Sequence, residues 1–417
     1  MPGSLSPGVQ QTVVRFGAWM PFGVAADMIA YALKVSVSDG TVRRQSEAAG
    51  AAYVAVQTAA VERLERESPV APTGAELLLL SADGAMVPLV GGEWAEVKSM
   101  AIGVVTRPVG AEGEPEIRTS ALSYFSRLSD HETFARQALV ETHRRGVETA
   151  QRVVAVADGS EWLQSFADYH RPDAVRILDF PHCAEHLSAA AQAVWGAGSQ
   201  AVTDWLATQT KDLLTGSPET VLAAVRALPT DSATQPSQAA EARDKTLGYL
   251  EKRQEQIRYA DFLAQGYPIG SGAMESANKL VVEARLKGSG MHWQREKVNP
   301  MLALRNIACN DRWEEAWPQI TAELRRQAQT RTQQRHALRP IASTPDPAKA
   351  ATSPPLVSAE PPDAAQSDAP PLDTEQPVPP TPRPKKVVNG KPTADHCWRQ
   401  FRFGRASRQP HDRSAAA

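Results

Sequence analysis

Cysteine is scarce in this chain of 417 residues, which contains only Cys183, Cys309 and Cys397. No two of them form a Cys-x-x-Cys pair, so a structural zinc site built from paired cysteines is excluded. A sparse and odd number of cysteines is typical of a reducing compartment. We therefore expect a cytoplasmic protein.

Long apolar runs are also missing, because no stretch approaches the roughly 18 residues that indicate a transmembrane helix. The N-terminus lacks a basic segment followed by an apolar one, so the sequence predicts no secretory signal and no membrane partner. Hydrophobic residues make up 42% of the chain, which is enough for a sizeable core.

The net charge of −2 does not mark the whole chain as a binder of polyanions. The charge is unevenly placed, however. Residues 281–339 contain 11 Lys and Arg against 6 Asp and Glu, and residues 381–413 contain 9 against 2. These basic stretches are candidates for contact with nucleic acid, and a solvated surface with a soluble tail is the alternative.

The N-terminal segment predicts helices. Apolar residues recur at helical spacing over 22–33, and Ser38 or Asp39 can cap a second helix that carries Arg43 and Arg44 near its start. Two helices joined by a short turn, the second opening with basic residues, resemble a helix-turn-helix. An ordinary helical hairpin fits the same pattern, so both interpretations stay open.

The central part predicts a sheet interleaved with helices. Three apolar runs of hairpin type are followed by a helix over 130–150, and then two short buried-type runs flank a helix over 161–169. The five runs cover 77–80, 86–90, 97–106, 153–156 and 174–178. This order of strands and helices is that of a ribonuclease-H-like α/β core.

The rest of the chain predicts helices and then a tail. Residues 187–262 and 271–330 have helical patterns, and the Pro-, Ala-, Ser- and Asp-rich segment after Pro340 is expected to be disordered. We therefore expect a mixed sheet interrupted by an all-helical insertion. The predicted divisions are an N-terminal helical region (1–70), the core in two parts (71–187 and 266–339), the helical insertion (188–265) and the tail with its basic end (340–417).

Three acidic motifs stand out. Asp83 and Asp158 each end an apolar run and precede a glycine, and Glu275 lies in a predicted helix after Gly-rich residues. Two Mg²⁺ ions held by three carboxylates are what phosphodiester cleavage and strand transfer need. A plain turn is the alternative for each Asp-Gly pair.

The sequence resembles DDE-type bacterial insertion-sequence transposases of the ISKra-type group, which are related to mutator-like elements. The resemblance spans roughly residues 10–325 and is strongest at SADG (81–84), DGSEW (158–162), DFPHCAEHL (179–187) and GSGAMESANK (270–279). It implies that Asp83, Asp158 and Glu275 are the catalytic metal ligands. The implied cofactor is a pair of Mg²⁺ ions, for which Mn²⁺ can substitute.

The resemblance also implies partners and a location. A transposase acts on double-stranded DNA at the element ends and the target, works as a homodimer or larger assembly on DNA, and is found in the bacterial cytoplasm at the nucleoid. Members of the group commonly carry further residues before the helical N-terminal segment, so a catalytic core is implied more firmly than a full transposase. A stand-alone ribonuclease-H-like nuclease and a non-catalytic DNA-binding remnant are the alternatives.

Asp179 competes with Asp158 for the second ligand position, because it also ends an apolar run. We favour Asp158, since a Cys-x-x-His motif normally follows the second acid by a helix and a strand. Cys183 and His186 match that motif. We interpret them as structural residues that orient the insertion, with direct contact to DNA or the active site as the alternative.

Further residues near Glu275 are candidates for contact with DNA. Asn278 and Lys279 lie one helical turn beyond it and share its face, where they could orient it or contact a phosphate, or Lys279 could form a plain ion pair with it. A basic and aromatic cluster suited to backbone contact and base stacking follows, with a solvated face and one buried tryptophan as the alternative. Its members are Arg285, Lys287, His292, Trp293 and Arg295.

Overall fold

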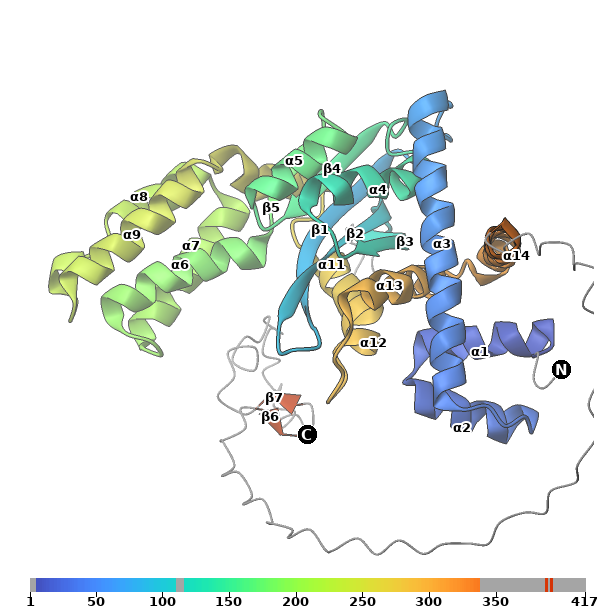
Figure 1. Ribbon diagram of the computed structural model, residues 1–417. Coiled ribbons are helices and arrows are strands. Elements are labelled where there is room, and N and C mark those ends of the chain that lie inside the picture. The colour runs from blue at the N-terminus through green and yellow to red at the C-terminus, as the bar shows by residue number, and fades with distance from the viewer. Residues whose placement is uncertain (1–4, 110–115, 338–386, 389–390, 393–417) are drawn as a thin grey trace, which may run out of the picture. The chain divides into compact units, whose positions relative to one another are not determined.

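The computed structural model describes residues 5–109, 116–337, 387–388 and 391–392 (Figure 1). The chain divides into two compact units, Met1–Ile341 and Ala342–Ala417. In the second unit, β6 (Val387–Val388) and β7 (Lys391–Pro392) pair as antiparallel strands. The predicted disorder of the tail and its basic end otherwise concern residues outside the described part.

The first unit is an α/β structure around one mixed sheet of five strands in the order β3-β2-β1-β4-β5. β1 pairs antiparallel with β2, and β2 with β3, whereas β1 with β4 and β4 with β5 are parallel. The strands are β1 (Leu77–Pro88), β2 (Trp94–Thr106), β3 (Arg118–Arg127), β4 (Arg152–Ala157) and β5 (Val175–Leu178). The mixed sheet of the α/β class is therefore confirmed.

Two predictions for the hairpin strands were wrong. Residues 77–80 and 86–90 were expected to be separate strands, but β1 runs unbroken through Asp83 and Gly84, which pair with Ser99 and Lys98 of β2. A ladder on the β2 side holds this Asp-Gly pair extended, so it is not a turn. The third antiparallel strand is β3, whose many serines hid its strand character.

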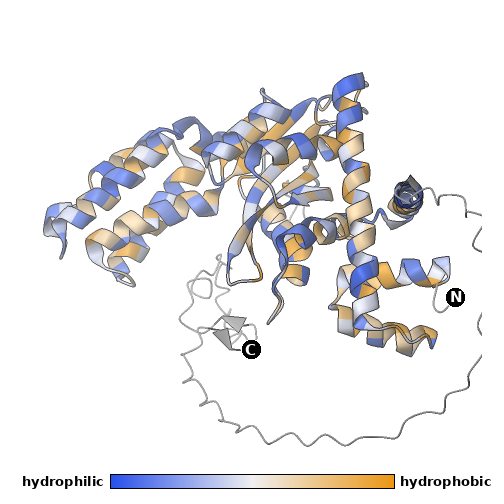
Figure 2. Cartoon of the chain, viewed as in Figure 1, coloured by the Kyte–Doolittle hydropathy of each residue, from blue (hydrophilic) through white to orange (hydrophobic). Residues whose placement is uncertain are grey.

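Helices cover both faces of the sheet. Because side chains alternate along a strand, β1 sends Leu78, Leu80 and Ala82 into a core with α4 (His131–Arg144) and α5 (Glu161–His170). Its other face contacts helices that follow the insertion and the insertion itself. Figure 2 shows apolar residues gathered on the strands and on the helix surfaces that face them.

Three helices precede the sheet. The predicted helix over 22–33 is confirmed as α2 (Phe22–Leu33), and Ser38 caps α3 (Asp39–Glu67) by accepting a hydrogen bond from the Thr41 amide. α1 (Pro7–Trp19) lies before them. α3 crosses α13 (Arg295–Cys309) so closely at Gly50 that a Cβ there would lie 2.1 Å from the Pro300 carbonyl oxygen.

The predicted helical insertion between β5 and the Glu275 helix is also helical in the structure. It begins earlier than expected, at Phe180, because Asp179 caps its first helix. Its helices are α6 (Phe180–Trp195), α7 (Gln200–Thr215), α8 (Pro218–Arg226), α9 (Pro236–Glu251) and α10 (Tyr259–Ala264), with short 3₁₀ turns η1 (Thr230–Ser232) and η2 (Gln254–Ile257).

One helical segment with a π-helical centre returns the chain to the sheet. It consists of α11 (Gly272–Ala277), the π-helix η3 (Asn278–Glu283) and α12 (Ala284–Leu286). The later helices are α13 and α14 (Trp313–Ala337). Within the described residues, no helix combines the length and apolar character needed to cross a membrane.

Candidate active site

Asp83 and Asp158 lie at matching positions on two neighbouring parallel strands. In the register of β1 with β4, Leu80 pairs with Ala155, and each acid follows its strand's member of this pair by the same number of residues. β4 ends at Ala157, so Asp158 opens the loop that follows. The carboxyl ends of neighbouring parallel strands are where α/β sheets commonly place ligand sites.

Burial and the charges of two nearby acids raise the pKa of Asp83. Burial is the main cause that raises this pKa from 3.8 to about 6, and the negative charges of Asp158 and Glu96 raise it as well. Hydrogen bonds from the Gly84 amide (2.7 Å) and from Asn278 (2.8 Å) act in the opposite direction. A cation beside Asp83 would favour its ionised form and offset the cost of burial.

Asn278 brings a third oxygen to this place. It is the first residue of the π-helix, its Nδ2 donates to Asp83 Oδ2, and its side chain is 9% exposed. Its Oδ1 is buried and has no hydrogen-bond partner among the described residues. An unpaired buried carbonyl oxygen is costly and needs an explanation, such as an ion or a water. Asn278 therefore contacts Asp83, one of the three acids singled out in the sequence.

Glu275 does not join the two aspartates in this structure. Its side chain is 42% exposed and forms a 3.4 Å ion pair with Lys279, which is the plain pairing considered from the sequence. Among the described residues, no group of three or more His, Cys, Asp or Glu side chains is placed to hold a metal ion. The structure therefore brings together Asp83, Asp158 and Asn278, and leaves Glu275 one helical turn before Asn278.

The chemistry of this oxygen set fits a hard divalent cation. Mg²⁺ prefers carboxylate and carbonyl oxygens and keeps several waters, so two carboxylates and an amide oxygen can hold it. The raised pKa of Asp83 and the unpaired Oδ1 of Asn278 are both features that a cation would relieve. We conclude that the residues present fit Mg²⁺ at Asp83 and Asp158.

Asp179 has a different role. It is 7% exposed, its Oδ1 accepts from the Ser271 amide (2.7 Å), and its Oδ2 accepts from the His182 amide at the start of α6 (3.3 Å). Burial raises its pKa. Both oxygens are thus used to cap α6 and to fix the start of the Glu275 helix, which favours Asp158 as the second metal ligand.

Cys183 and His186 lie inside the insertion. Cys183 is fully buried, and burial raises the pKa of its thiol to about 12, so it remains protonated. The His186 ring stacks on Tyr249 with centroids 3.9 Å apart, and burial is the main cause that lowers its pKa to about 4. These contacts favour the structural interpretation of the Cys-x-x-His motif.

The prediction that Arg285 and Trp293 contact DNA is wrong for this conformation. Arg285 is 1% exposed and donates to the Gly17 carbonyl (3.0 Å), while Trp293 is 7% exposed and donates to the Leu286 carbonyl (3.1 Å). The guanidinium lies over the rings of Phe22 and Trp293 at 4.6 and 5.2 Å. A planar, weakly hydrated guanidinium tolerates such burial against aromatic rings.

The other predicted basic contacts differ in their surroundings. Lys287 pairs with Glu283 at 2.8 Å, and His292 lies 3.3 Å from the Leu89 carbonyl oxygen. Three side chains stay exposed on the surface, where a polyanion could reach them, and these are Arg43, Arg44 and Lys279.

The sequence did not indicate several residues that lie near Asp83 and Asp158. Glu96 and Lys98 of β2 pair at 2.7 Å beside Asp83 and Gly84, and the Lys98 ammonium lies 5.4 Å from the Trp162 ring centroid. Cross-strand pairing of β1 with β2 would have indicated them, but the register was not visible in the sequence. Tyr249 and Arg253 were also missed, since some 90 residues separate them from Asp158.

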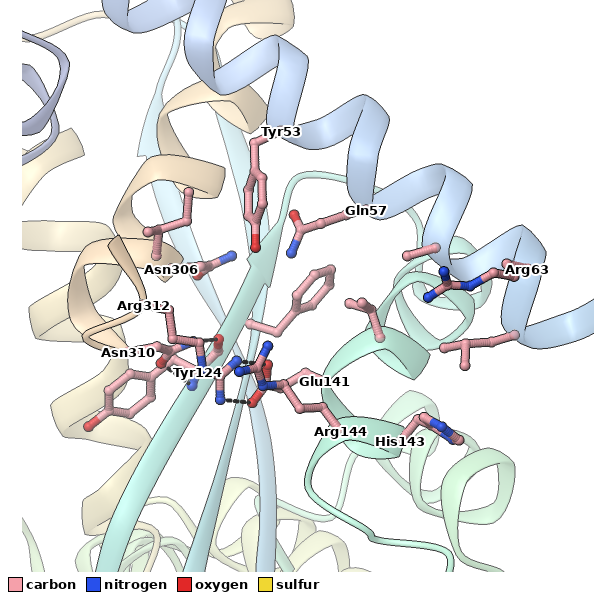
Figure 3. Close-up of a pocket in the computed structure, with 15 residues that line it drawn as sticks. Tyr53, Gln57, Arg63, Tyr124, Glu141, His143, Arg144, Asn306, Asn310 and Arg312 are labelled. Atoms are coloured by element: carbon pink, nitrogen blue, oxygen red, sulfur yellow. Dashed lines mark hydrogen bonds and ion pairs between the residues drawn. The ribbon is translucent and has the colours of Figure 1, made fainter. Parts of the chain in front are cut away.

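A cavity of about 270 Å³ lies away from these acids (Figure 3). None of Asp83, Asp158 and Glu275 lines it. Several of its charged groups are paired: Arg312 makes two hydrogen bonds of 2.5 and 2.8 Å to Glu141, and Arg144 pairs with Glu315 at 2.5 Å. We assign this network to the packing of α3, α4 and the α13–α14 junction.

The free energy of unfolding should depend on pH through Asp83. An acid with a raised folded pKa binds its proton more tightly when folded, so its contribution is full below the unfolded pKa of 3.8 and is lost as the pH rises through about 6. We expect Asp83→Asn to become more stable relative to the wild type over this range in EDTA. Urea unfolding of both proteins from pH 4 to 7 measures the difference in the free energy of unfolding, and a difference that stays constant would contradict a raised pKa for this buried carboxylate.

No family model matches this chain, and no curated protein matches it. The class of protein is therefore argued from the geometry above. Asp83 within β1, Asp158 directly after β4 and the buried amide oxygen of Asn278 form a set of oxygens whose chemistry fits a divalent cation.

Proposed function

We propose that this protein is a metal-dependent DNA strand-cleaving and strand-joining enzyme, a DDE transposase of an insertion sequence with a ribonuclease-H-like core. The observation that carries the proposal is the juxtaposition of Asp83 and Asp158 at matching positions on parallel β1 and β4. The strand order β3-β2-β1-β4-β5, with its first three strands antiparallel, supports the core assignment. The four motifs that resemble the ISKra-type group support the class.

Each residue at the site has a proposed role in holding or orienting a metal ion. Asp83 and Asp158 hold Mg²⁺ through ionised oxygens, and Asn278 fixes the orientation of Asp83 by donating to its Oδ2. When bound there, Mg²⁺ would activate a water or a 3′-hydroxyl of the DNA as nucleophile and would stabilise negative charge on the leaving oxygen. Glu275 is proposed as the third acid, since it is half-exposed and its ion pair with Lys279 is of the weak surface kind.

The N-terminal helices are proposed to contact DNA in a helix-turn-helix manner. Arg43 and Arg44 are exposed near the start of α3, where Arg44 donates to the Thr41 hydroxyl at 3.2 Å. Double-stranded DNA at the element ends and target is the proposed partner, with a homodimer or larger assembly on it. The proposed location is the bacterial cytoplasm, at the nucleoid.

The position of Glu275 favours a second candidate, a DNA-binding remnant of a transposase without catalysis. Because Glu275 lies apart from the aspartates, the third ligand is not in place in this conformation. A stand-alone nuclease is less favoured, since it needs neither the helical insertion nor the N-terminal helices.

The test uses the full chain and a linear DNA fragment that carries its own coding sequence with flanking DNA. With Mg²⁺ we expect strand breaks at defined positions that leave 3′-hydroxyl ends, and with EDTA we expect none, because the carboxylates alone cannot activate water. Binding without cleavage in Mg²⁺ and in Mn²⁺ would favour the remnant. Cleavage that persists in EDTA would contradict the metal-dependent mechanism.

A further inference from the structure

The loop that carries Asp158 is held from the side by the helical insertion. The Tyr249 hydroxyl donates to the main-chain carbonyl of Asp158, and Arg253 donates to the Gly159 carbonyl from both Nε (3.0 Å) and Nη2 (2.6 Å). Tyr249 lies in α9 and Arg253 just beyond it. The insertion thus contacts the two consecutive peptide carbonyls at and after the acid.

Tyr249 and Arg253 also support each other. The Arg253 guanidinium lies 3.9 Å from the Tyr249 ring centroid, its Nη1 donates to the Tyr249 carbonyl (3.0 Å), and the residue is 9% exposed. His186 stacks on the same Tyr249 ring, with 17° between the planes. His186, Tyr249 and Arg253 therefore pack as one unit, in which Arg253 is buried and the other two are partly buried, and we call it the insertion clamp.

The loop is shaped to fit this clamp. Gly159 has φ +80°, and a Cβ there would lie 2.6 Å from Arg253 Nε and 2.8 Å from the Tyr249 hydroxyl. On the other side of the loop, Asp158 Oδ1 accepts from the Ser160 amide at 2.8 Å. The main chain is therefore fixed by the insertion, and one carboxylate oxygen is fixed by the loop itself.

We infer that Tyr249 and Arg253 are positioning residues, through which the helical insertion sets the carboxylate of Asp158 for a divalent cation beside Asp83. The inference rests on the proposed function for its metal, and it assigns the insertion a part in building the site. Holding both carbonyls fixes the backbone from which the carboxylate projects. Residues that orient a metal ligand typically change metal affinity by about 10–100-fold when they are replaced.

The test measures Mn²⁺ affinity of the full chain by electron paramagnetic resonance, without DNA. Tyr249→Phe removes the hydroxyl and keeps the ring stack. Arg253→Met removes the two hydrogen bonds to the Gly159 carbonyl and the one to the Tyr249 carbonyl, whereas Arg253→Lys keeps the charge with a single donor group. The matched control is Arg258→Met, because Arg258 pairs only with Glu219 and Glu255 among the described residues. Urea unfolding shows whether each variant folds.

We expect Mn²⁺ affinity to fall about 10–100-fold in Arg253→Met and by less in Tyr249→Phe, to recover in part in Arg253→Lys, and to stay unchanged in the control. Folded Tyr249→Phe and Arg253→Met proteins with wild-type affinity would overturn the inference, whatever the cleavage assay shows. Loss of Mn²⁺ affinity in a protein that never cleaves DNA would leave the inference standing and remove the proposed function.

Discussion

Asp83→Asn is expected to reduce Mg²⁺-dependent DNA cleavage about 10²–10³-fold, because the amide removes the negative charge that holds the metal. The same change should increase the free energy of unfolding at pH 7.5 in EDTA, since it removes a buried carboxylate whose pKa is about 6. A pKa raised by about two units corresponds to a gain of at most about 3 kcal/mol in the free energy of unfolding when the carboxylate is replaced. Lower DNA cleavage together with a higher free energy of unfolding in Asp83→Asn would show that Asp83 is needed for function and not for folding.

The matched control for Asp83→Asn is Glu96→Gln. Glu96 is an acid near Asp83, but its carboxylate is paired with Lys98 at 2.7 Å. We expect cleavage by this variant to stay within about tenfold of the wild type, since Glu96 neighbours the proposed metal ligand Asp83 and is not itself a ligand. An equal loss of DNA cleavage in Asp83→Asn and Glu96→Gln would show that the local negative charge controls the reaction, and not Asp83 as a metal ligand.

Asp158→Asn and Asp179→Asn are expected to change different properties, DNA cleavage in the first variant and the free energy of unfolding in the second. Asp158→Asn should reduce cleavage about 10²–10³-fold with little effect on folding. Asp179→Asn should lower the free energy of unfolding by about 1 kcal/mol, because it weakens the cap of α6 and the contact with the Ser271 amide, while the folded protein still cleaves. Cleavage rates and urea unfolding of the two variants separate these roles.

The assignment of the second acid depends on that comparison. If folded Asp179→Asn protein loses cleavage as completely as Asp158→Asn, then Asp179 is itself a ligand. If Asp158→Asn cleaves like the wild type, the pairing of Asp83 with Asp158 is not the active site.

Much of the fold could be predicted from the sequence where the pattern is local. The short apolar runs at β4 and β5, the helix at 22–33 and the cap at Ser38 all follow from neighbouring residues. β1 was divided wrongly because Asp83-Gly84 looks like a turn, and only the pairing with β2 keeps it extended. β3 was missed because its strand character depends on packing beside β2.

The site could be predicted in part. Asp83, Asp158 and Asn278 were identified from their motifs, and the structure places them together. The expected contact of Arg285 and Trp293 with DNA does not fit their burial, since a basic and aromatic pattern does not reveal that the Gly17 carbonyl of α1 binds the Arg285 guanidinium. Tyr249 and Arg253 carry no local signal, because their function comes from tertiary contacts with a distant loop.

The most direct test of the shared metal site is anomalous X-ray diffraction from crystals of the full chain grown with Mn²⁺ and a DNA duplex. A shared site requires Mn²⁺ bound by Asp83 and Asp158, with a second ion about 3.5–4 Å away and Glu275 turned toward it. Mn²⁺ bound elsewhere, with Asp83 and Asp158 free of metal under conditions in which Mn²⁺ supports cleavage, would contradict it.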